Sequence, residues 1–156
     1  MSSRAREDVE LPYGGTFTFK EMPNGEMRRR FVSPNGTRMS ETVGPDWDST
    51  EGNFPWQDAH YHRGLTEHYF VQSGWVGFLF EKDGKLQWQR VETGGHICFP
   101  PLVAHKVLMG PQAVMATLLL GTSIGNSERK EDDWWPVPNE YLWELEKIKI
   151  EETFRL

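Results

Sequence analysis

The feature that most limits the fold is a series of short strand-like runs, separated by turn signals, between residues 59 and 120. Ser73-Gly74, Asp83-Gly84 and Thr93-Gly94-Gly95 interrupt the apolar runs with residues that suit tight turns. Pro100-Pro101 ends another run, because proline has no N–H to donate within a central strand. Many short strands at near-regular spacing predict a sandwich or barrel, with the jelly roll among the options. The strands expected here cover residues 69–72, 75–81, 86–91, 97–99, 105–109 and 114–120.

The segment before this region continues the β pattern. Strands are expected around residues 16–20, 26–32 and 38–43, with hairpin signals at Asn24-Gly25 and Asn35-Gly36. Residues 1–10 are polar and are expected to form a flexible N-terminal tail. The chain has 156 residues, the usual size of one domain, so residues 11–156 are expected to form a single domain.

The last part of the chain has a different periodicity. Residues 139 to about 151 predict a C-terminal helix, which is expected to pack one apolar stripe against the barrel or against a second subunit. Trp134 and Trp135 add apolar surface nearby, so a homodimer is expected. The residues that form the stripe are Tyr141, Leu142, Leu145 and Ile148.

Charge and cysteine content exclude several classes of protein. A net charge of −6 argues against a nucleic-acid partner. The basic run Arg28-Arg29-Arg30 is interpreted as solvated edge charge on a strand, and we expect no inward basic cluster that would grip a phosphate. A single cysteine, Cys98, rules out an internal disulfide. The polar start and the lack of a long apolar run predict a cytoplasmic protein with no membrane segment.

The segment from His60 to Glu67 carries the clearest chemical signal. His60 and His62 are two residues apart, so on a strand their imidazoles lie on one face. Four residues then turn the chain and return a carboxylate, Glu67, beside them. His105 opens another strand after the proline turn. Three imidazoles and a carboxylate suit one divalent ion such as iron, manganese, zinc or nickel, and they leave a coordination position open, as in catalytic sites.

Two stretches resemble the conserved motifs of the cupin family. Gly52, His60, His62, Glu67 and Gly74 are similar to the first cupin motif, and Gly95, Pro100 and His105 are similar to the second. The resemblance covers roughly the middle third of the chain. It implies a small single-domain metal-binding cupin with a double-stranded β-helix, which is a jelly-roll barrel. It also implies that His60, His62, Glu67 and His105 are the metal ligands.

Residues near these ligands are candidates for the rest of the site. Tyr69 and His96 are speculative catalytic residues that would move a proton, although a turn position without a catalytic role is favoured for His96. His68 follows Glu67 directly and is expected to face away. The residues expected to line the pocket, by their strand faces or their place at the barrel mouth, are Trp56, Val71, Val107 and Met109.

Three functions remain open at this point. The first is a metalloenzyme that chelates a small oxygenated substrate, sugar-like or keto-acid-like, for isomerisation or a related proton transfer. The second is an iron- or manganese-dependent dioxygenase, and the third is a small-molecule binding or sensing protein without turnover. The fold does not choose among them.

Overall fold

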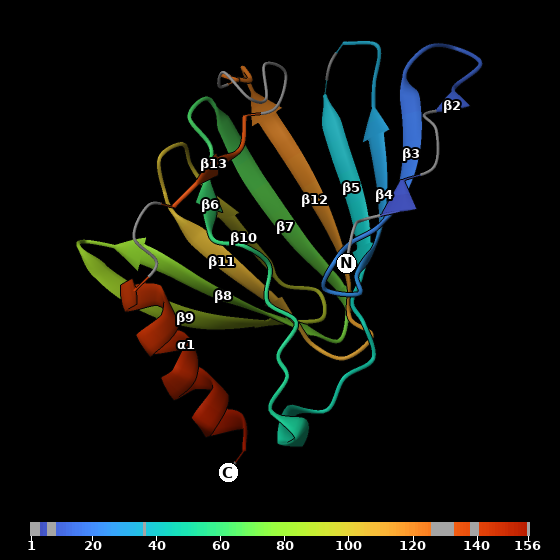
Figure 1. Ribbon diagram of the computed structural model, residues 1–156. Helices are drawn as coiled ribbons and strands as arrows, with labels where there is room; N and C mark the ends of the chain where they lie inside the picture. The colour runs from blue at the N-terminus through green and yellow to red at the C-terminus, as the bar shows by residue number, and fades with distance from the viewer. Residues whose placement is uncertain (1–3, 6–8, 36, 126–132, 138–140, 156) are drawn as a thin grey trace.

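Two antiparallel β-sheets face each other in the computed structural model, and one helix covers the outside of the second sheet (Figure 1). The structure describes residues 4–5, 9–35, 37–125, 133–137 and 141–155. The all-β prediction is confirmed, because turns at the predicted positions separate the strands, and burial alternates along strands such as Leu65–Ser73. Within the described residues, no helix is long and apolar enough to span a membrane.

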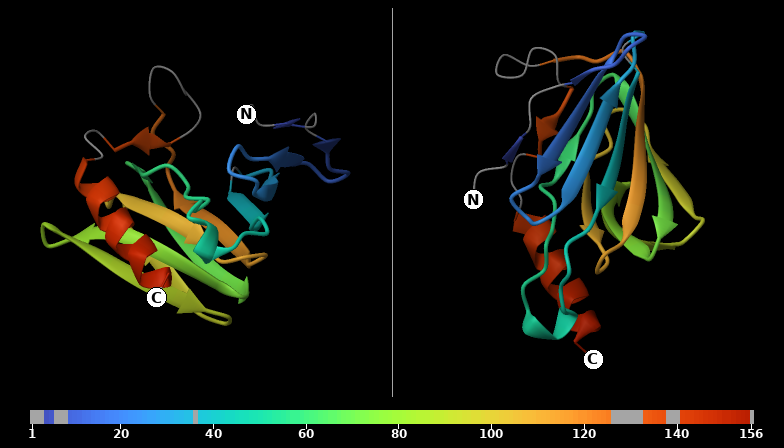
Figure 2. Two further views of the ribbon diagram at one scale, coloured as in Figure 1. Left: turned by 60° about the horizontal axis from the view of Figure 1, so that its bottom comes forward. Right: turned by 90° about the vertical axis from the view of Figure 1, so that its right-hand side faces the viewer.

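The first sheet has the strand order β1-β3-β4-β5-β12-β7-β10, with β2 paired to β3 at its edge. Its N-terminal part, β3 to β5, continues well beyond the second sheet in Figure 2. The strands of this sheet are β1 (Arg4–Ala5), β2 (Val9–Glu10), β3 (Thr16–Glu21), β4 (Met27–Val32), β5 (Arg38–Val43), β7 (Leu65–Ser73), β10 (His96–Phe99) and β12 (Val114–Gly121).

The second sheet has the order β13-β6-β11-β8-β9. A single 3-10 turn, η1 (Ser49–Glu51), interrupts the long loop before it. The strands of this sheet are β6 (His60–Tyr61), β8 (Trp75–Lys82), β9 (Lys85–Glu92), β11 (His105–Met109) and β13 (Trp135–Pro136).

The N-terminal segment, predicted as a flexible polar tail, contributes two short strands. Arg4–Ala5 and Val9–Glu10 both pair antiparallel with β3. Residues 1–3 and 6–8 lie outside the described part of the chain.

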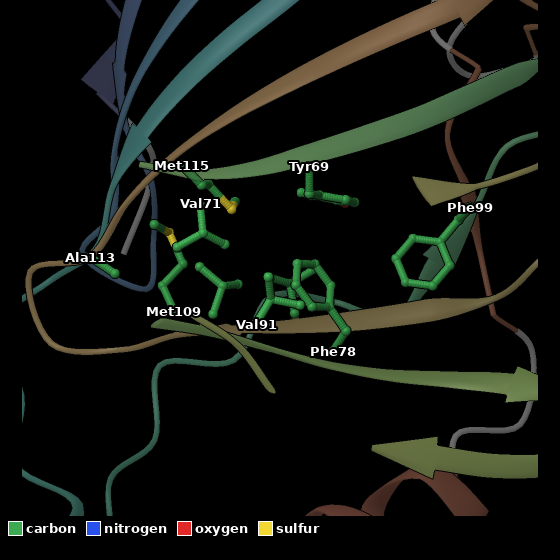
Figure 3. Close-up of a cluster of buried hydrophobic side chains, with 10 residues drawn as sticks. Tyr69, Val71, Phe78, Val91, Phe99, Met109, Ala113 and Met115 are labelled. Carbon is green, nitrogen blue, oxygen red and sulfur yellow. The ribbon is translucent and has the colours of Figure 1, made fainter. Parts of the chain in front are cut away.

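The apolar core fills the space between the two sheets (Figure 3). Inward side chains of β7, β8, β11 and β12 alternate with outward ones, as the period of two requires. Full burial of one such side chain stabilises the fold by about 1.5–3 kcal/mol. The buried members of the core are Tyr69, Val71, Val76, Phe78, Val91, Phe99, Val107, Met109, Ala113 and Met115.

The helix α1 (Tyr141–Phe154) packs through a different face from the predicted stripe. Trp143 is 2% exposed and belongs to one buried cluster with Leu79, on the outer face of the second sheet, against which Trp88 also packs. Leu142, Leu145 and Ile148 are exposed instead. The helix packs through the neighbouring face, because that face contains the larger apolar ring of Trp143. The side chain of Tyr141 and the predicted start at residue 139 lie outside the described residues. Contact of the exposed stripe with a second subunit stays a prediction.

Candidate metal centre

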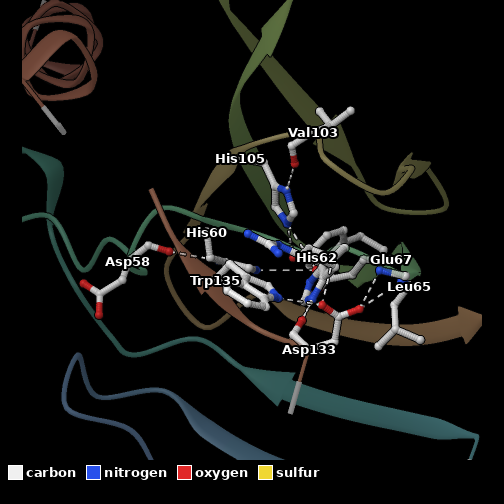
Figure 4. Close-up of polar contacts among 12 residues, drawn as sticks. Asp58, His60, His62, Leu65, Glu67, Val103, His105, Asp133 and Trp135 are labelled. Atoms are coloured by element: carbon white, nitrogen blue, oxygen red, sulfur yellow. Dashed lines mark hydrogen bonds and ion pairs between the residues drawn. The ribbon is translucent and has the colours of Figure 1, made fainter. Parts of the chain in front are cut away.

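Three imidazoles and one carboxylate converge between the two sheets (Figure 4). β6 carries His60 and is followed by His62, β7 carries Glu67, and β11 places His105 directly opposite His60. All four side chains are buried, and their candidate ligand atoms lie within 4.8 Å of one another. The Nε2 atoms of His60 and His105 are 3.5 and 3.1 Å from Glu67 Oε2, and His62 Nε2 is in direct contact with the same oxygen.

Backbone carbonyls orient every one of the three rings. His60 Nδ1 donates to Asp58 O and His105 Nδ1 donates to Val103 O, each over 2.9 Å. His62 Nδ1 donates in the same way to the carbonyl of Asp133. A ring that carries its proton on Nδ1 has its lone pair on Nε2, which is the atom that faces Glu67. This is the hydrogen-bond pattern that orients metal-bound histidines in proteins.

The charge of the cluster calls for a cation at its centre. In the Nδ1-protonated form, three nitrogen lone pairs and a carboxylate oxygen point at one another, and only a proton or a metal ion between them removes that repulsion. Burial raises the pKa of Glu67, but hydrogen bonds from His105, His60 and His62 outweigh it and hold the pKa well below its usual range. Burial lowers the pKa of His62, but the hydrogen bond to Glu67 and the charge of Glu67 raise it by more, so the pKa of His62 is raised overall. The donor set therefore fits a divalent ion.

Asp133 supports the centre, and sequence reasoning missed it. The residue is 1% exposed. One carboxylate oxygen accepts hydrogen bonds from Arg63 N at 2.8 Å and Trp135 Nε1 at 3.0 Å, and the other accepts from Gly64 N at 2.7 Å and Leu65 N at 3.1 Å. The carboxylate thus holds the turn between His62 and Glu67, while its carbonyl holds the His62 ring.

Gly64 has no room for a side chain in that turn. A Cβ atom at this position would lie 1.9 Å from the carbonyl oxygen of Thr122. The loop between the ligands therefore needs glycine for close packing. In the sequence, this glycine and the acidic run of three residues before Trp134 were the only signals, and neither has a characteristic spacing.

A cavity of about 850 Å³ opens beside the four candidate ligands. His60, His62 and Glu67 line it, together with Trp56 and Tyr69, which were predicted to belong to the site. Trp134 also lines it, and its ring stacks on His60 with a centroid distance of 5.7 Å. This volume is typical of sites for small molecules.

Tyr69 presents its hydroxyl to the metal centre. The oxygen lies 3.3 Å from His105 Nε2, and the ring is 1% exposed. Burial raises the pKa of Tyr69 well above its usual value, the charge of Glu67 raises it further, and Arg28 opposes this effect. This shift favours the neutral phenol, which can donate a hydrogen bond or a proton.

Other predicted site residues lie away from the cavity. His96 stands on the outer face of β10, where its Nε2 is 3.0 Å from Nδ1 of His68 on the outer face of β7. The alternation of β10 turns Ile97 and Phe99 inward and His96 outward, so His96 cannot reach the reacting centre. The three apolar residues expected in the pocket wall, Val71, Val107 and Met109, are members of the buried core and not of the cavity lining.

The basic run on β4 departs from its interpretation as solvated edge charge. Arg28 and Arg30 face the cavity together with Lys20 of β3, whereas Arg29 points outward. The sequence showed the period of two, but it did not show that β4 covers the cavity.

Comparison with solved structures identifies the fold. The cupin domain of Drosophila melanogaster CENP-C superposes with a TM-score of 0.52 at 9% identity, over 68% of this chain and 70% of that one. An oxalate oxidase gives 0.52 at 14% identity, over 86% and 72% of the two chains. CapF, solved with the inhibitor 3-isopropenyl-tropolone, gives 0.58 at 13% identity, over 79% of this chain and 34% of CapF. No protein-family model and no curated protein sequence matches the chain.

Proposed function

We propose that this protein, which has the cupin fold, is a divalent-metal enzyme that acts on a small oxygenated substrate by isomerisation or a related proton transfer. One observation carries the proposal. Three imidazole nitrogens and one carboxylate oxygen, all buried and pre-oriented, meet at the wall of a cavity large enough for a small molecule. Perturbed titratable groups in such a cavity mark functional sites in proteins.

The four side chains His60, His62, Glu67 and His105 would hold the ion. A nitrogen-rich set with one carboxylate suits iron, manganese, zinc or nickel. When bound, the ion supplies a Lewis acid that polarises a carbonyl or hydroxyl oxygen of the substrate. Four protein ligands leave room for that oxygen in a five- or six-coordinate ion.

Tyr69 is the residue that would move the proton. Its hydroxyl lies 3.3 Å from a candidate ligand nitrogen, on the wall of the same cavity. A neutral phenol so placed donates to a substrate oxygen on which negative charge develops. The variant Tyr69→Phe should keep the metal content of the parent protein and lose about 10²- to 10⁴-fold in turnover.

An iron- or manganese-dependent dioxygenase is the second candidate, and the acidic groups of the cavity favour it. Among the described lining residues, Glu26 is fully buried and bound to Arg28 and Gln57. Asp58 is exposed, and Figure 4 shows its carboxylate pointing away from the imidazoles. Neither is placed as a general base, and a redox reaction needs none. The fold accommodates such chemistry, since an oxalate oxidase shares it, but the fold alone does not assign it.

Two assays on the same metal-loaded protein separate the candidates. Protein loaded with Fe(II), Mn(II) or Zn(II) is incubated in D2O with a panel of hydroxy acids, keto acids and free sugars. Deuterium incorporation without oxygen consumption supports proton transfer, and oxygen consumption with Fe(II) or Mn(II) alone supports the dioxygenase. Binding of a panel member with neither reaction would contradict both and leave a small-molecule binding protein.

A further inference from the structure

Alternate residues of β4 differ sharply in exposure. The side chain of Arg28 is 19% exposed and Arg30 is half-buried, whereas the side chain of Arg29 is 59% exposed. Arg28 and Arg30 both line the cavity that contains the candidate metal ligands. Burying a charged side chain costs free energy. The two inward arginines of this strand are therefore expected to have a binding role in the cavity that offsets this cost.

The strand register places Arg30 in line with Tyr69. Arg30 is opposite Ser40 on β5, Ser40 is opposite Thr117 on β12, and Thr117 is opposite Tyr69 on β7. All four residues line the cavity, so they form one polar row across its floor. Three strand spacings separate the two ends, at most about 14 Å between backbones, and the long arginine side chain covers part of that distance.

Arg28 occupies the neighbouring row and is held in place by a buried carboxylate. It lies opposite Thr42, and its Nη2 atom is 3.1 Å from Oε1 of Glu26. Glu26 is fully buried and also accepts hydrogen bonds from Asn24 and Gln57. Among the described residues, Glu26 is the only hydrogen-bond partner of Arg28. An arginine has five N–H donors in a planar fork that matches a carboxylate or a phosphate.

We propose that Arg28 and Arg30 form a subsite for an oxyanion, so that the substrate is a small organic acid or phosphate ester whose charged group binds there while its other oxygen faces the metal centre. This inference rests on the proposed function and narrows its substrate class. With this subsite the substrate is an anion, whereas the metal centre alone would bind a neutral sugar equally well.

The carboxylates on the described part of the cavity lining do not leave a negative charge at the metal centre. Glu26 is paired with Arg28, and the exposed Asp58 is screened by solvent. A divalent ion bound at Glu67 would leave one positive charge there, which an anionic substrate would compensate.

Three variants and three probes test the subsite. Glu26→Gln combined with Arg28→Met removes the buried pair together, so no unpaired charge is left, and Arg30→Gln removes the second guanidinium. Arg29→Gln, on the outer face of the same strand, is the matched control. Calorimetry then measures the binding of pyruvate, uncharged methyl pyruvate and inorganic phosphate to Mn(II)-loaded protein, after thermal unfolding has shown that each variant is folded.

We expect pyruvate or phosphate to bind the parent protein more tightly than methyl pyruvate. Each inward variant should weaken that binding about 10- to 100-fold, as expected for loss of a charge-assisted hydrogen bond, and Arg29→Gln should not. If the inward variants weaken the binding of pyruvate, the substrate carries a carboxylate. If they weaken the binding of phosphate, the substrate is phosphorylated. Equal binding of pyruvate and its ester, parent-like affinity in the inward variants, or no binding of either anion at millimolar concentration would overturn the subsite.

Metal content separates this test from a test of the proposed function. If the parent protein holds no Mn(II), the proposed function fails, and the comparison of pyruvate with its ester on metal-free protein still decides the role of the arginines. If Mn(II) binds and the inward variants bind anions like the parent protein, only the subsite fails.

Discussion

Replacing Asp133 with asparagine should destabilise the protein by about 2–4 kcal/mol at neutral pH, because two N–H groups lose their acceptor at about 1–2 kcal/mol each, the lower part of the range since most of these donors are only partly buried. Each carboxylate oxygen accepts two hydrogen bonds, one pair from Arg63 N and Trp135 Nε1 and the other from Gly64 N and Leu65 N. In asparagine one of these oxygens becomes an NH2 group, which faces two donors. The backbone carbonyl that binds the His62 ring is unchanged.

The assay is thermal and urea unfolding of the metal-free protein. For a domain of this size, the expected loss corresponds to a melting temperature lowered by about 5–15 °C. The difference should shrink in acid. Burial raises the pKa of Asp133, but the backbone N–H groups of Arg63 and Gly64 outweigh it and hold the pKa below its ordinary value of 3.8. A depressed folded-state pKa stabilises the protein above 3.8, and this contribution is lost as the pH falls through the folded-state value.

Asp58→Asn is the matched control for this prediction. Asp58 also binds a ligand imidazole through its backbone carbonyl, but its side chain is exposed. The control should unfold within about 0.5 kcal/mol of the parent protein, as surface substitutions do. Equal stability of the Asp133→Asn variant and the parent, or equal losses in both variants, would refute the assignment of Asp133 as the support of the ligand loop.

Three further predictions concern the metal ligands and the packing of the helix. His62→Ala should lower metal occupancy sharply and leave circular dichroism unchanged, whereas His68→Ala on the outer face should change neither metal occupancy nor circular dichroism. Metal affinity, measured with a competing chelator, should fall as the pH drops through neutrality, because the contact with Glu67 raises the pKa of His62 and a proton then competes for Nε2; a flat profile would contradict this. Trp143→Ala should cost about 3–5 kcal/mol of unfolding free energy, while Leu142→Ala, at an exposed helix position, should cost little, and similar losses would reverse our assignment of the packed face.

The β-strands could be predicted because their signals are local. Glycine and proline turns and the period of two occur within a few residues, and the observed strands follow them closely. The packed face of the helix could not be predicted in this way. Leu142, Leu145 and Ile148 form an apolar stripe, but the outer face of the second sheet accepts the larger ring of Trp143. Which of two apolar strips packs depends on the surface that it meets, and a helix sequence does not contain that information.

The same distinction holds for the site. The four candidate ligands could be grouped because His60, His62 and Glu67 are close in sequence and resemble a family motif. Asp133 lies 66 residues beyond Glu67, and Arg28 lies 39 residues before it, as their residue numbers show. Contacts at such separations depend on strand order, so the supporting carboxylate and the inward arginines emerged only from the three-dimensional arrangement.

The most direct test of the metal site is elemental analysis of the purified, untagged protein, before and after incubation with Fe(II), Mn(II), Zn(II) or Ni(II). A metal site made of His60, His62, Glu67 and His105 should bind about one equivalent of metal per chain, and a folded variant that lacks His62 should bind none. A folded parent protein that holds no metal even after incubation would contradict this assignment.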